Sequence, residues 1–203
     1  MMEPLSPSDQ RERVAREAFY EDDLRQMSLA VNYLRWQFDL IRPFLGRRIL
    51  EIGAGTGNFT LRMAERAEEI VCIEPNDSCY SQLVRRVGAT PRVTIYQTYA
   101  EDFLAQPGNV GRFDTVVGMN VLEHVRDDVH VLGELVRALA PGGCLVLQVP
   151  AGEWAFGEID ARLGHYRRYS KRSMRDKLRG LSLKIERLKY MNTVGLLAWA
   201  WNA

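Results

Sequence analysis

The sequence of 203 residues has few cysteines, no long apolar run and almost no net charge. Its three cysteines, Cys72, Cys79 and Cys144, form no C-x-x-C pair and have no histidine beside them, so they indicate neither a disulfide framework nor a zinc site. No run of about 18 apolar residues could span a bilayer, and the polar start lacks the apolar centre of a signal peptide. The net charge of +1 gives no overall attraction to nucleic acid or to a membrane. These absences predict a cytoplasmic protein with reduced thiols.

The length and composition are those of an ordinary globular chain, with 46% hydrophobic and 26% charged residues. A prior of about 150 residues per domain does not require two domains. We therefore expect one compact domain overall, in which residues 1–46 form an N-terminal helical cap and residues 47–203 the main domain.

A short apolar run that ends in three alternating glycines is the most informative stretch. Residues 49–52 (Ile-Leu-Glu-Ile) suit a buried parallel strand, and the glycines at 53, 55 and 57 let the backbone turn sharply and approach a ligand closely. The dinucleotide fingerprint G-x-G-x-x-G would need a glycine at Asn58, so a nicotinamide oxidoreductase is the weaker interpretation. An ordinary tight turn between strand and helix is the alternative without a ligand.

Further along the chain, the pattern alternates strands with helices. Glu74 ends a second predicted strand, where a carboxylate can accept hydrogen bonds from both hydroxyls of a ribose, although a solvated strand end would look the same. We expect helices near residues 58–66, 76–87, 127–140 and 170–179, and strands at 92–96, 111–117, 144–149 and 183–190. The turn Pro141-Gly142-Gly143 is expected to come before the strand that starts at Cys144.

Three motifs together resemble class I S-adenosylmethionine (SAM) dependent methyltransferases of the small-molecule type. They are E-x-G-x-G-x-G from Glu51 to Gly57, F-D-x-V-x-x-x-x-V-L-E-H-V from Phe113 to Val125, and the P-G-G turn. The resemblance implies an α/β fold, a Rossmann-like and mostly parallel sheet with helices on both faces and an N-terminal helical cap. It also implies SAM as cofactor, S-adenosyl-L-homocysteine as product, and a cofactor site made of Glu51, Gly53, Ala54, Gly55, Gly57, Glu74, Pro75, Ala100, Glu101 and Asn120. Tyr99 departs from the pattern of many relatives, in which an aspartate precedes the alanine.

His124 is the first candidate for a catalytic group. It follows the residue expected beside the methionine end of SAM, and an imidazole with a reference pKa of ~6.5 suits proton transfer near neutrality. A purely structural turn is the alternative. The O-methyltransferases of ubiquinone biosynthesis resemble this segment and bind a divalent ion through E-x-x-E-H, but Asn120 replaces the first carboxylate here, so we predict no metal.

The stretch Gly164-His165-Tyr166-Arg167-Arg168-Tyr169 belongs to residues 160–170, which we expect to form a loop after the last predicted parallel strand, where acceptors usually enter. We interpret His165 as a second candidate base, Tyr166 and Tyr169 as stacking groups, and Arg167 and Arg168 as partners for a carboxylate or phosphate. A structural salt-bridge network with Asp160 and contact with RNA phosphates are the alternatives.

The ends of the chain carry less information. Residues 9–44 are expected to form two helices with a break near Asp22, and Tyr20, Tyr33 and Trp36 either pack on the core or form a lid over the SAM site. Residues 193–201 are apolar but too short to span a membrane. An exposed apolar end would be an association surface, so a homodimer through N- or C-terminal helices is a further expectation. Whether the natural chain ends here or continues is left open.

The sequence therefore predicts methyl transfer from SAM to an oxygen, nitrogen or carbon of a small-molecule acceptor. A nucleic-acid acceptor is not favoured, because neither the Pro-Cys nucleophile of cytosine methyltransferases nor an N-P-P-Y motif is present. A non-catalytic partner protein with the same fold, and an enzyme of this fold that performs decarboxylation or cyclisation, are the remaining alternatives.

Overall fold

The computed structural model describes residues 29–192 and residue 195. The predicted first helix, the break near Asp22, Tyr20 and most of the apolar stretch 193–201 lie outside the described residues. Within residues 29–192, no helix is long and apolar enough to cross a membrane.

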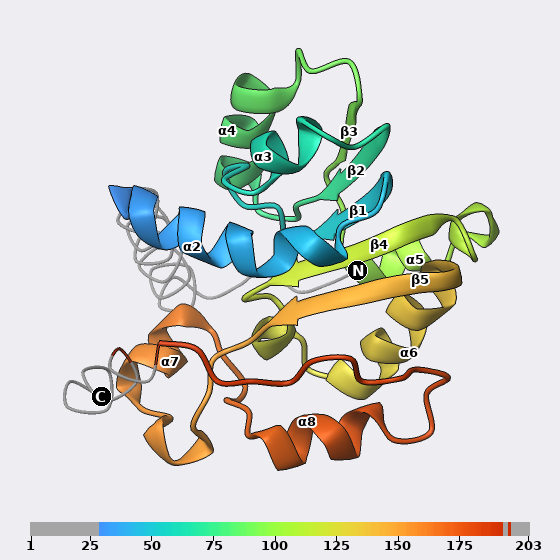
Figure 1. The fold of residues 1–203 in the computed structure, drawn as a ribbon. Coiled ribbons are helices and arrows are strands. Elements are labelled where there is room, and N and C mark those ends of the chain that lie inside the picture. The colour runs from blue at the N-terminus through green and yellow to red at the C-terminus, as the bar shows by residue number, and fades with distance from the viewer. Residues whose placement is uncertain (1–28, 193–194, 196–203) are drawn as a thin grey trace, which may run out of the picture.

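Five parallel strands form one sheet in the order β3-β2-β1-β4-β5 (Figure 1). The strands are β1 (Arg48–Ile52), β2 (Glu69–Ile73), β3 (Val93–Tyr96), β4 (Phe113–Met119) and β5 (Leu139–Gln148). In the centre, Leu50 of β1 lies opposite Val71 of β2 on one side and Val116 of β4 on the other. The chain reverses its direction of winding between β1 and β4, so the loops after these two strands diverge at the carboxyl edge of the sheet.

Helices cover both faces of the sheet and connect its strands. They are α2 (Val31–Ile41), α3 (Thr60–Ala64), α4 (Asp77–Val87), α5 (Ala100–Leu104), α6 (Asp128–Ala138), α7 (Glu158–Leu163) and α8 (Lys171–Leu178). Short 3-10 turns complete the connections: η1 (Arg42–Phe44), η2 (Pro107–Asn109), η3 (Leu122–His124) and η4 (Glu153–Ala155). The prediction of a Rossmann-like α/β fold is confirmed.

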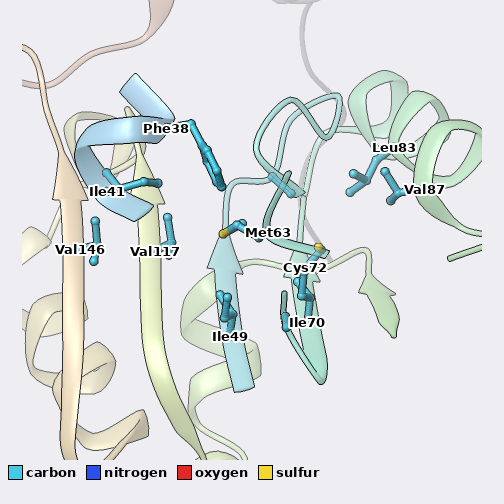
Figure 2. Packing of buried hydrophobic residues seen from close by; sticks show 12 residues of the cluster. Phe38, Ile41, Ile49, Met63, Ile70, Cys72, Leu83, Val87, Val117 and Val146 are labelled. Carbon is cyan, nitrogen blue, oxygen red and sulfur yellow. The ribbon is translucent and has the colours of Figure 1, made fainter. Parts of the chain in front are cut away.

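The core lies on the two faces of the sheet because successive strand side chains point to opposite sides. On the face shown in Figure 2, Phe38 and Ile41 of α2 pack with Val117 and Val146, and Met63 of α3 packs in the same cluster as Ile49 and Ile70. On the other face, Leu50, Val71 and Val116 pack against α5 and α6. Burial on both faces explains why β1, β2 and β4 are mostly apolar in sequence. Each fully buried aliphatic side chain contributes about 1.5–3 kcal/mol.

Strand β5 differs from the prediction at its start. Pro141, Gly142 and Gly143 do not precede the strand but lie inside it, as a bulge between the Leu139–Phe113 and Cys144–Thr115 pairs. Gly142 has a φ of +78°, which glycine adopts at little cost. Between these two pairs, one residue of β4, Asp114, lies opposite four residues of β5, 140–143. The sequence pattern that predicted a turn corresponds to this bulge.

Two other segments also differ from the prediction. Residues 160–163, expected in a loop, form most of α7, which ends at Gly164 with a φ of +78°. Residues 183–190, expected as an edge strand, pair with no strand of the described sheet. Leu188 packs instead with the cluster beneath α8, and Ile185 is 43% exposed, so the alternating pattern reflects one-sided contact rather than a β ladder.

Candidate functional site

A cavity of about 1130 Å³ opens at the carboxyl edge of the sheet, above the ends of β1, β2 and β4. Its walls are the glycine loop, the ends of β2 and β4, turn η3, the segment after β5 and residues 182–192. Small-ligand pockets usually measure about 300–1000 Å³. This cavity is therefore large enough for a nucleoside-sized cofactor and for part of an acceptor.

The glycine loop forms the floor of the cavity, and its backbone requires glycine. Gly53 has a φ of +61°, and a Cβ atom there would lie 2.4 Å from Cγ2 of Val121. Gly57 has a φ of +80°, and a Cβ atom there would lie 2.9 Å from Cδ1 of Leu83. The left-handed conformation strains any other residue at both positions, and the close contact with Val121 adds to the cost at Gly53.

Glu74 connects the glycine loop to the end of β2. Its Oε2 accepts a hydrogen bond of 2.8 Å from the Gly55 amide, and its Oε1 accepts one of 2.9 Å from the Asn76 amide. The side chain is 3% exposed, and burial raises the pKa of its carboxyl. Each oxygen keeps a lone pair, so the fixed carboxylate can accept two more hydrogen bonds.

Glu51 lies at the base of the same cavity but is bound to helix α3. Its Oε2 accepts a hydrogen bond of 2.6 Å from the Thr60 hydroxyl, and the Cys72 thiol lies 3.6 Å from the same oxygen. The side chain is 3% exposed, and burial raises the pKa of this carboxyl to about 7. Its charge near neutrality therefore depends on what fills the cavity.

The other residues predicted to bind the cofactor line the same cavity, except Gly57, which lies against Leu83 and Val87 of α4. Asn120 has a φ of +55°, and its backbone N–H donates a hydrogen bond to the Gln148 carbonyl. The residue therefore lies between the ends of β4 and β5. Tyr99 is 65% exposed at the opening. The remaining predicted residues in the lining are Ala54, Pro75, Ala100 and Glu101.

His124 and Glu123 project from η3, directly after β4. Burial lowers the pKa of His124 to about 4, and the neighbouring imidazole of His165 acts in the same direction, so this side chain is neutral at pH 7. Burial raises the pKa of Glu123 to about 8. The rings of His124 and His165 meet edge to face with centroids 4.7 Å apart. The structure thus brings together the two predicted bases, which are 41 residues apart.

The buried carboxylate of Asp160 organises the stretch that contains His165. Nδ1 of His165 lies 2.7 Å from Oδ1 of Asp160, and Nε of Arg168 donates to both oxygens of Asp160 at 2.8 Å. Although burial opposes ionisation, the hydrogen bonds from Arg168 and His165 hold the pKa of Asp160 below its usual value. The Arg168 side chain is 4% exposed and also donates to the Ala151 carbonyl. The interactions of Asp160 match the structural alternative for this stretch.

A second buried carboxylate, Asp128 at the start of α6, holds the rest of the stretch. It accepts a hydrogen bond of 3.0 Å from the Tyr169 hydroxyl, and both Arg167 and Lys177 lie 2.8 Å from its Oδ1. Tyr166 is 55% exposed beside this network. A role in substrate binding stays a prediction for Tyr166, Arg167, Arg168 and Tyr169.

Sequence reasoning missed Asp128 and the segment 182–190 as parts of the site. Asp128 resembled one of several acids that open a helix, and nothing in its position along the chain indicated three basic or hydroxyl partners. Lys184, Arg187 and Lys189 alternate with apolar residues, and that period suggested a strand rather than a cavity wall.

A family model described as a methyltransferase domain matches residues 16–203. The chain belongs to this methyltransferase family. The prediction of a SAM-dependent methyltransferase enzyme with a class I fold is confirmed, and SAM is its cofactor. The fold of a SAM-dependent methyltransferase from Thermotoga maritima aligns with a TM-score of 0.64 and 20% identity, over 83% of this chain and 79% of that chain.

Curated relatives correct the predicted acceptor. The tRNA U34 carboxymethyltransferase of Saccharophagus degradans is 34% identical over 139 residues, covering 64% of this chain and 42% of the relative. The protein of the same name from Methylococcus capsulatus is 34% identical over 142 residues, covering 64% and 43%. The chain thus spans about two fifths of the length of these relatives. The prediction of a small-molecule acceptor, with nucleic acid not favoured, is wrong. The prediction relied on the low net charge of the whole chain and on the absence of motifs for methylation of cytosine and of exocyclic amines, and neither argument covers a uridine acceptor.

Proposed function

We propose that this methyltransferase acts on tRNA and transfers a SAM-derived carbon group to a uridine. The observation that carries the proposal is the 34% identity to enzymes named for carboxymethyl transfer to U34 of tRNA. The transferred group is either a methyl or, as in the names of these relatives, a carboxymethyl group.

The cavity offers the donors and acceptors that SAM requires. Both oxygens of Glu74 are fixed by backbone amides and keep lone pairs for the two ribose hydroxyls. The close approach allowed by Gly53 and Gly55 lets the backbone pass beside the cofactor, and Gly57 permits the packing of the loop against α4. Glu51, Ala54, Pro75, Ala100, Glu101 and Asn120 complete the proposed cofactor contacts.

When bound, SAM supplies an activated carbon on a positively charged sulfur. The chain's own contribution is to hold the acceptor in line with that carbon, and positioning of this kind can supply about 7–11 kcal/mol of a barrier. His124, with a pKa of about 4, is a weak base, so it serves better to orient the acceptor than to remove a tightly held proton. We retain His165 as the second proposed catalytic group, since it touches the His124 ring.

Basic side chains at the edge of the cavity suit an RNA acceptor. Five of them, which we call the basic rim, are Arg126, Lys171, Lys184, Arg187 and Lys189. Three of the five acidic residues in the lining, Glu51, Glu74 and Glu123, are buried, which leaves Glu101 and Glu186 at the surface. The opening is therefore locally positive although the whole chain has a net charge of +1, and such a patch binds phosphates.

Exposed aromatic rings near the opening complement the basic rim. Tyr99 is 65% exposed and Tyr190 is 46% exposed, and both line the cavity. Proteins that read single-stranded RNA stack unpaired bases on such rings. We propose that a uridine from a tRNA loop stacks on Tyr99, because the ammonium of Lys171 already lies over the Tyr190 ring, 4.8 Å from its centroid.

Incubation of the chain with unmodified tRNA and SAM tests the proposal. We expect a modified uridine in the digested tRNA, and its mass distinguishes a methyl from a carboxymethyl group. Glu74→Gln should lower the yield, whereas Glu65→Gln, an exposed carboxyl on the turn after α3, should not. Because relatives are longer, SAM binding is measured in the same samples. SAM binding without any tRNA product, also with a carboxylated donor, would contradict the tRNA acceptor but not the cofactor.

The remaining predictions stay open to test. We propose S-adenosyl-L-homocysteine as the product, residues 1–46 as a helical cap on a domain of residues 47–203, and a cytoplasmic location, where tRNA is found. Tyr33 of α2 lines the cavity, which supports contact between the cap and the ligands.

A further inference from the structure

Glu123, His124 and His165 bring three potential metal ligands to one corner of the cavity. One ligand atom from each lies within 4.8 Å of the other two. The sequence supplied only the adjacent pair Glu123 and His124, and the third group comes from the segment after α7. No metal was predicted because Asn120 replaces a carboxylate, but His165 provides a ligand that no local motif includes.

The separation of the ligand atoms is wider than in a formed metal site. With metal–ligand bonds of about 2.1 Å, two ligand atoms on one tetrahedral zinc ion lie about 3.4 Å apart. Binding of an ion would therefore draw the ligand atoms together by up to about 1.4 Å, and the two imidazoles start from close contact. Their rings already meet edge to face with centroids 4.7 Å apart.

Glu123 has a buried carboxyl oxygen for which the described residues provide no hydrogen-bond partner. Its side chain is 1% exposed, and Oε2 has no hydrogen-bond partner within residues 29–192. Burial of a carboxyl oxygen without a partner costs about 1–3 kcal/mol. A cation at this oxygen would remove that cost.

His165 has the second interaction that metal-binding histidines usually show. Its Nδ1 lies 2.7 Å from the Asp160 carboxylate, and this contact fixes the ring and directs Nε2 as the coordinating nitrogen. Asp160 is itself fixed by Arg168 and by the Gly157 amide. The positive charge of Arg168 is balanced by Asp160, so it does not by itself repel a cation from Glu123.

The backbone holds the two halves of the cluster together. The Tyr166 amide donates a hydrogen bond of 2.8 Å to the Glu123 carbonyl, which ties the His165 segment to η3. Within the described residues, this tie keeps His165 in place without any ion. The cluster is therefore organised before a metal arrives.

We propose that Glu123, His124 and His165 bind one zinc-type divalent ion at the cavity wall. Two imidazoles and one carboxylate are a donor set that favours Zn²⁺ over Mg²⁺, which prefers oxygen ligands. Three protein ligands leave a coordination position open toward the cavity, where the ion would polarise an oxygen of the acceptor. The ion-binding proposal holds whatever the acceptor is.

Calorimetric titration of the untagged, metal-stripped chain with ZnCl₂ and MgCl₂ tests the site. We expect one zinc ion per chain and at least about tenfold weaker binding of magnesium. His165→Ala and the isosteric Glu123→Gln should each weaken zinc binding at least about tenfold. His130→Ala is the matched control, because His130 is the third histidine of the chain and lies exposed on α6, and it should bind zinc as the wild type does.

Cobalt substitution gives a second readout that does not depend on activity. Co²⁺ in the wild type and in His130→Ala should give the visible absorption of a four-coordinate nitrogen and oxygen site, and Glu123→Gln should lose it. Thermal unfolding of each variant identifies any that fails to fold, in which case His124→Asn replaces it. No zinc binding by the wild type, or equal binding by all folded variants, would overturn the proposal.

Discussion

At the scale of single residues, Glu74 shows how a buried carboxylate is made ready for a ligand. Two backbone amides hold it in one orientation, and its remaining lone pairs face the cavity. The hydrogen bonds fix the side chain before any ligand binds, so little conformational entropy is lost on binding.

We predict that Glu74→Gln weakens S-adenosyl-L-homocysteine binding by about tenfold to a hundredfold, because hydrogen bonds to charged groups are worth roughly 1.5–3 kcal/mol. The amide NH₂ of glutamine would also face the Gly55 or the Asn76 N–H, so one donor would lie against another. Calorimetric titration measures the loss, with Glu65→Gln as control. Unchanged affinity in Glu74→Gln would rule out this carboxylate as the ribose ligand.

Glu51 makes stability depend on pH. Its pKa is about 7 in the folded chain against a reference value of 4.5, so the native state binds the proton more tightly than the unfolded state. The contribution to the free energy of unfolding is therefore fully present below about pH 4.5 and is lost as pH rises through about 7.

We predict that the wild type loses up to about 3 kcal/mol relative to Glu51→Gln between about pH 4.5 and pH 8, since glutamine does not ionise. Urea unfolding of the ligand-free proteins at several pH values measures the difference. Glu65→Gln should follow the wild-type pH curve in parallel. A constant difference between wild type and Glu51→Gln at all pH values would mean that folding does not raise the pKa of Glu51.

At the scale of elements, the glycine loop depends on the turn after β4. Gly53 approaches Val121, so the floor of the cofactor site and the segment that leads to His124 are packed directly together. A change in one loop therefore moves the other.

We predict that Gly53→Ala destabilises the fold by about 2–4 kcal/mol, from the left-handed backbone and the clash with Val121, and that it abolishes measurable SAM binding. Gly133→Ala is the matched control. Gly133 lies in α6, and a Cβ atom there would meet nothing within 4 Å, so it should stabilise by up to about 1 kcal/mol. Urea unfolding and calorimetry measure both variants. A stable Gly53→Ala protein that binds SAM would contradict the role of this loop.

The elements that the sequence predicted well are those with strong local signals. Strands β1, β2 and β4 are mostly apolar, and α4 (Asp77–Val87) lies close to the predicted helix at residues 76–87. Asn76 caps this helix by accepting a hydrogen bond from the Cys79 amide. The bulge in β5 and the unpaired segment 183–190 were missed because their local patterns have more than one structural meaning. Alternation of apolar and polar residues fits an edge strand, but it also fits an extended segment that buries one side without pairing to a strand.

The candidate site was only partly predictable for a related reason. Glu74 and the glycines follow strand ends, where parallel topology places ligands, so local position was sufficient. The contact of His124 with His165 depends on how the chain returns after α7, and the partners of Asp128 come from residues 167, 169 and 177. Such long-range contacts leave no mark on local periodicity.

At the scale of the whole molecule, the basic rim concentrates positive charge on one edge of a nearly neutral chain. Lys184, Arg187 and Lys189 are exposed and lie on the segment that closes the cavity. Arg47, Arg66 and Arg92 are also exposed, but they lie near the amino ends of β1, β2 and β3, at the opposite edge of the sheet.

We predict that replacing Lys184, Arg187 and Lys189 together by alanine weakens tRNA binding and reduces the salt dependence of log K by about 2, because each phosphate ion pair that is removed lowers the slope by about 0.7. The matched variant with Arg47, Arg66 and Arg92 replaced by alanine removes the same charge from the other edge and should keep the wild-type slope. Binding titrations at several salt concentrations give both slopes. Equal slopes for the two variants would place the RNA elsewhere.

The hydrogen bond from the Tyr166 amide to the Glu123 carbonyl has a consequence for how the site can be observed. This bond joins the segment after α7 to the turn after β4, so the segment cannot swing away from the cavity without breaking it. The Tyr166 amide proton exchanges with deuterium only when the bond is open. The exchange rate of this one amide therefore reports how often the cavity wall opens. It can be measured while tRNA, SAM or zinc is added in turn.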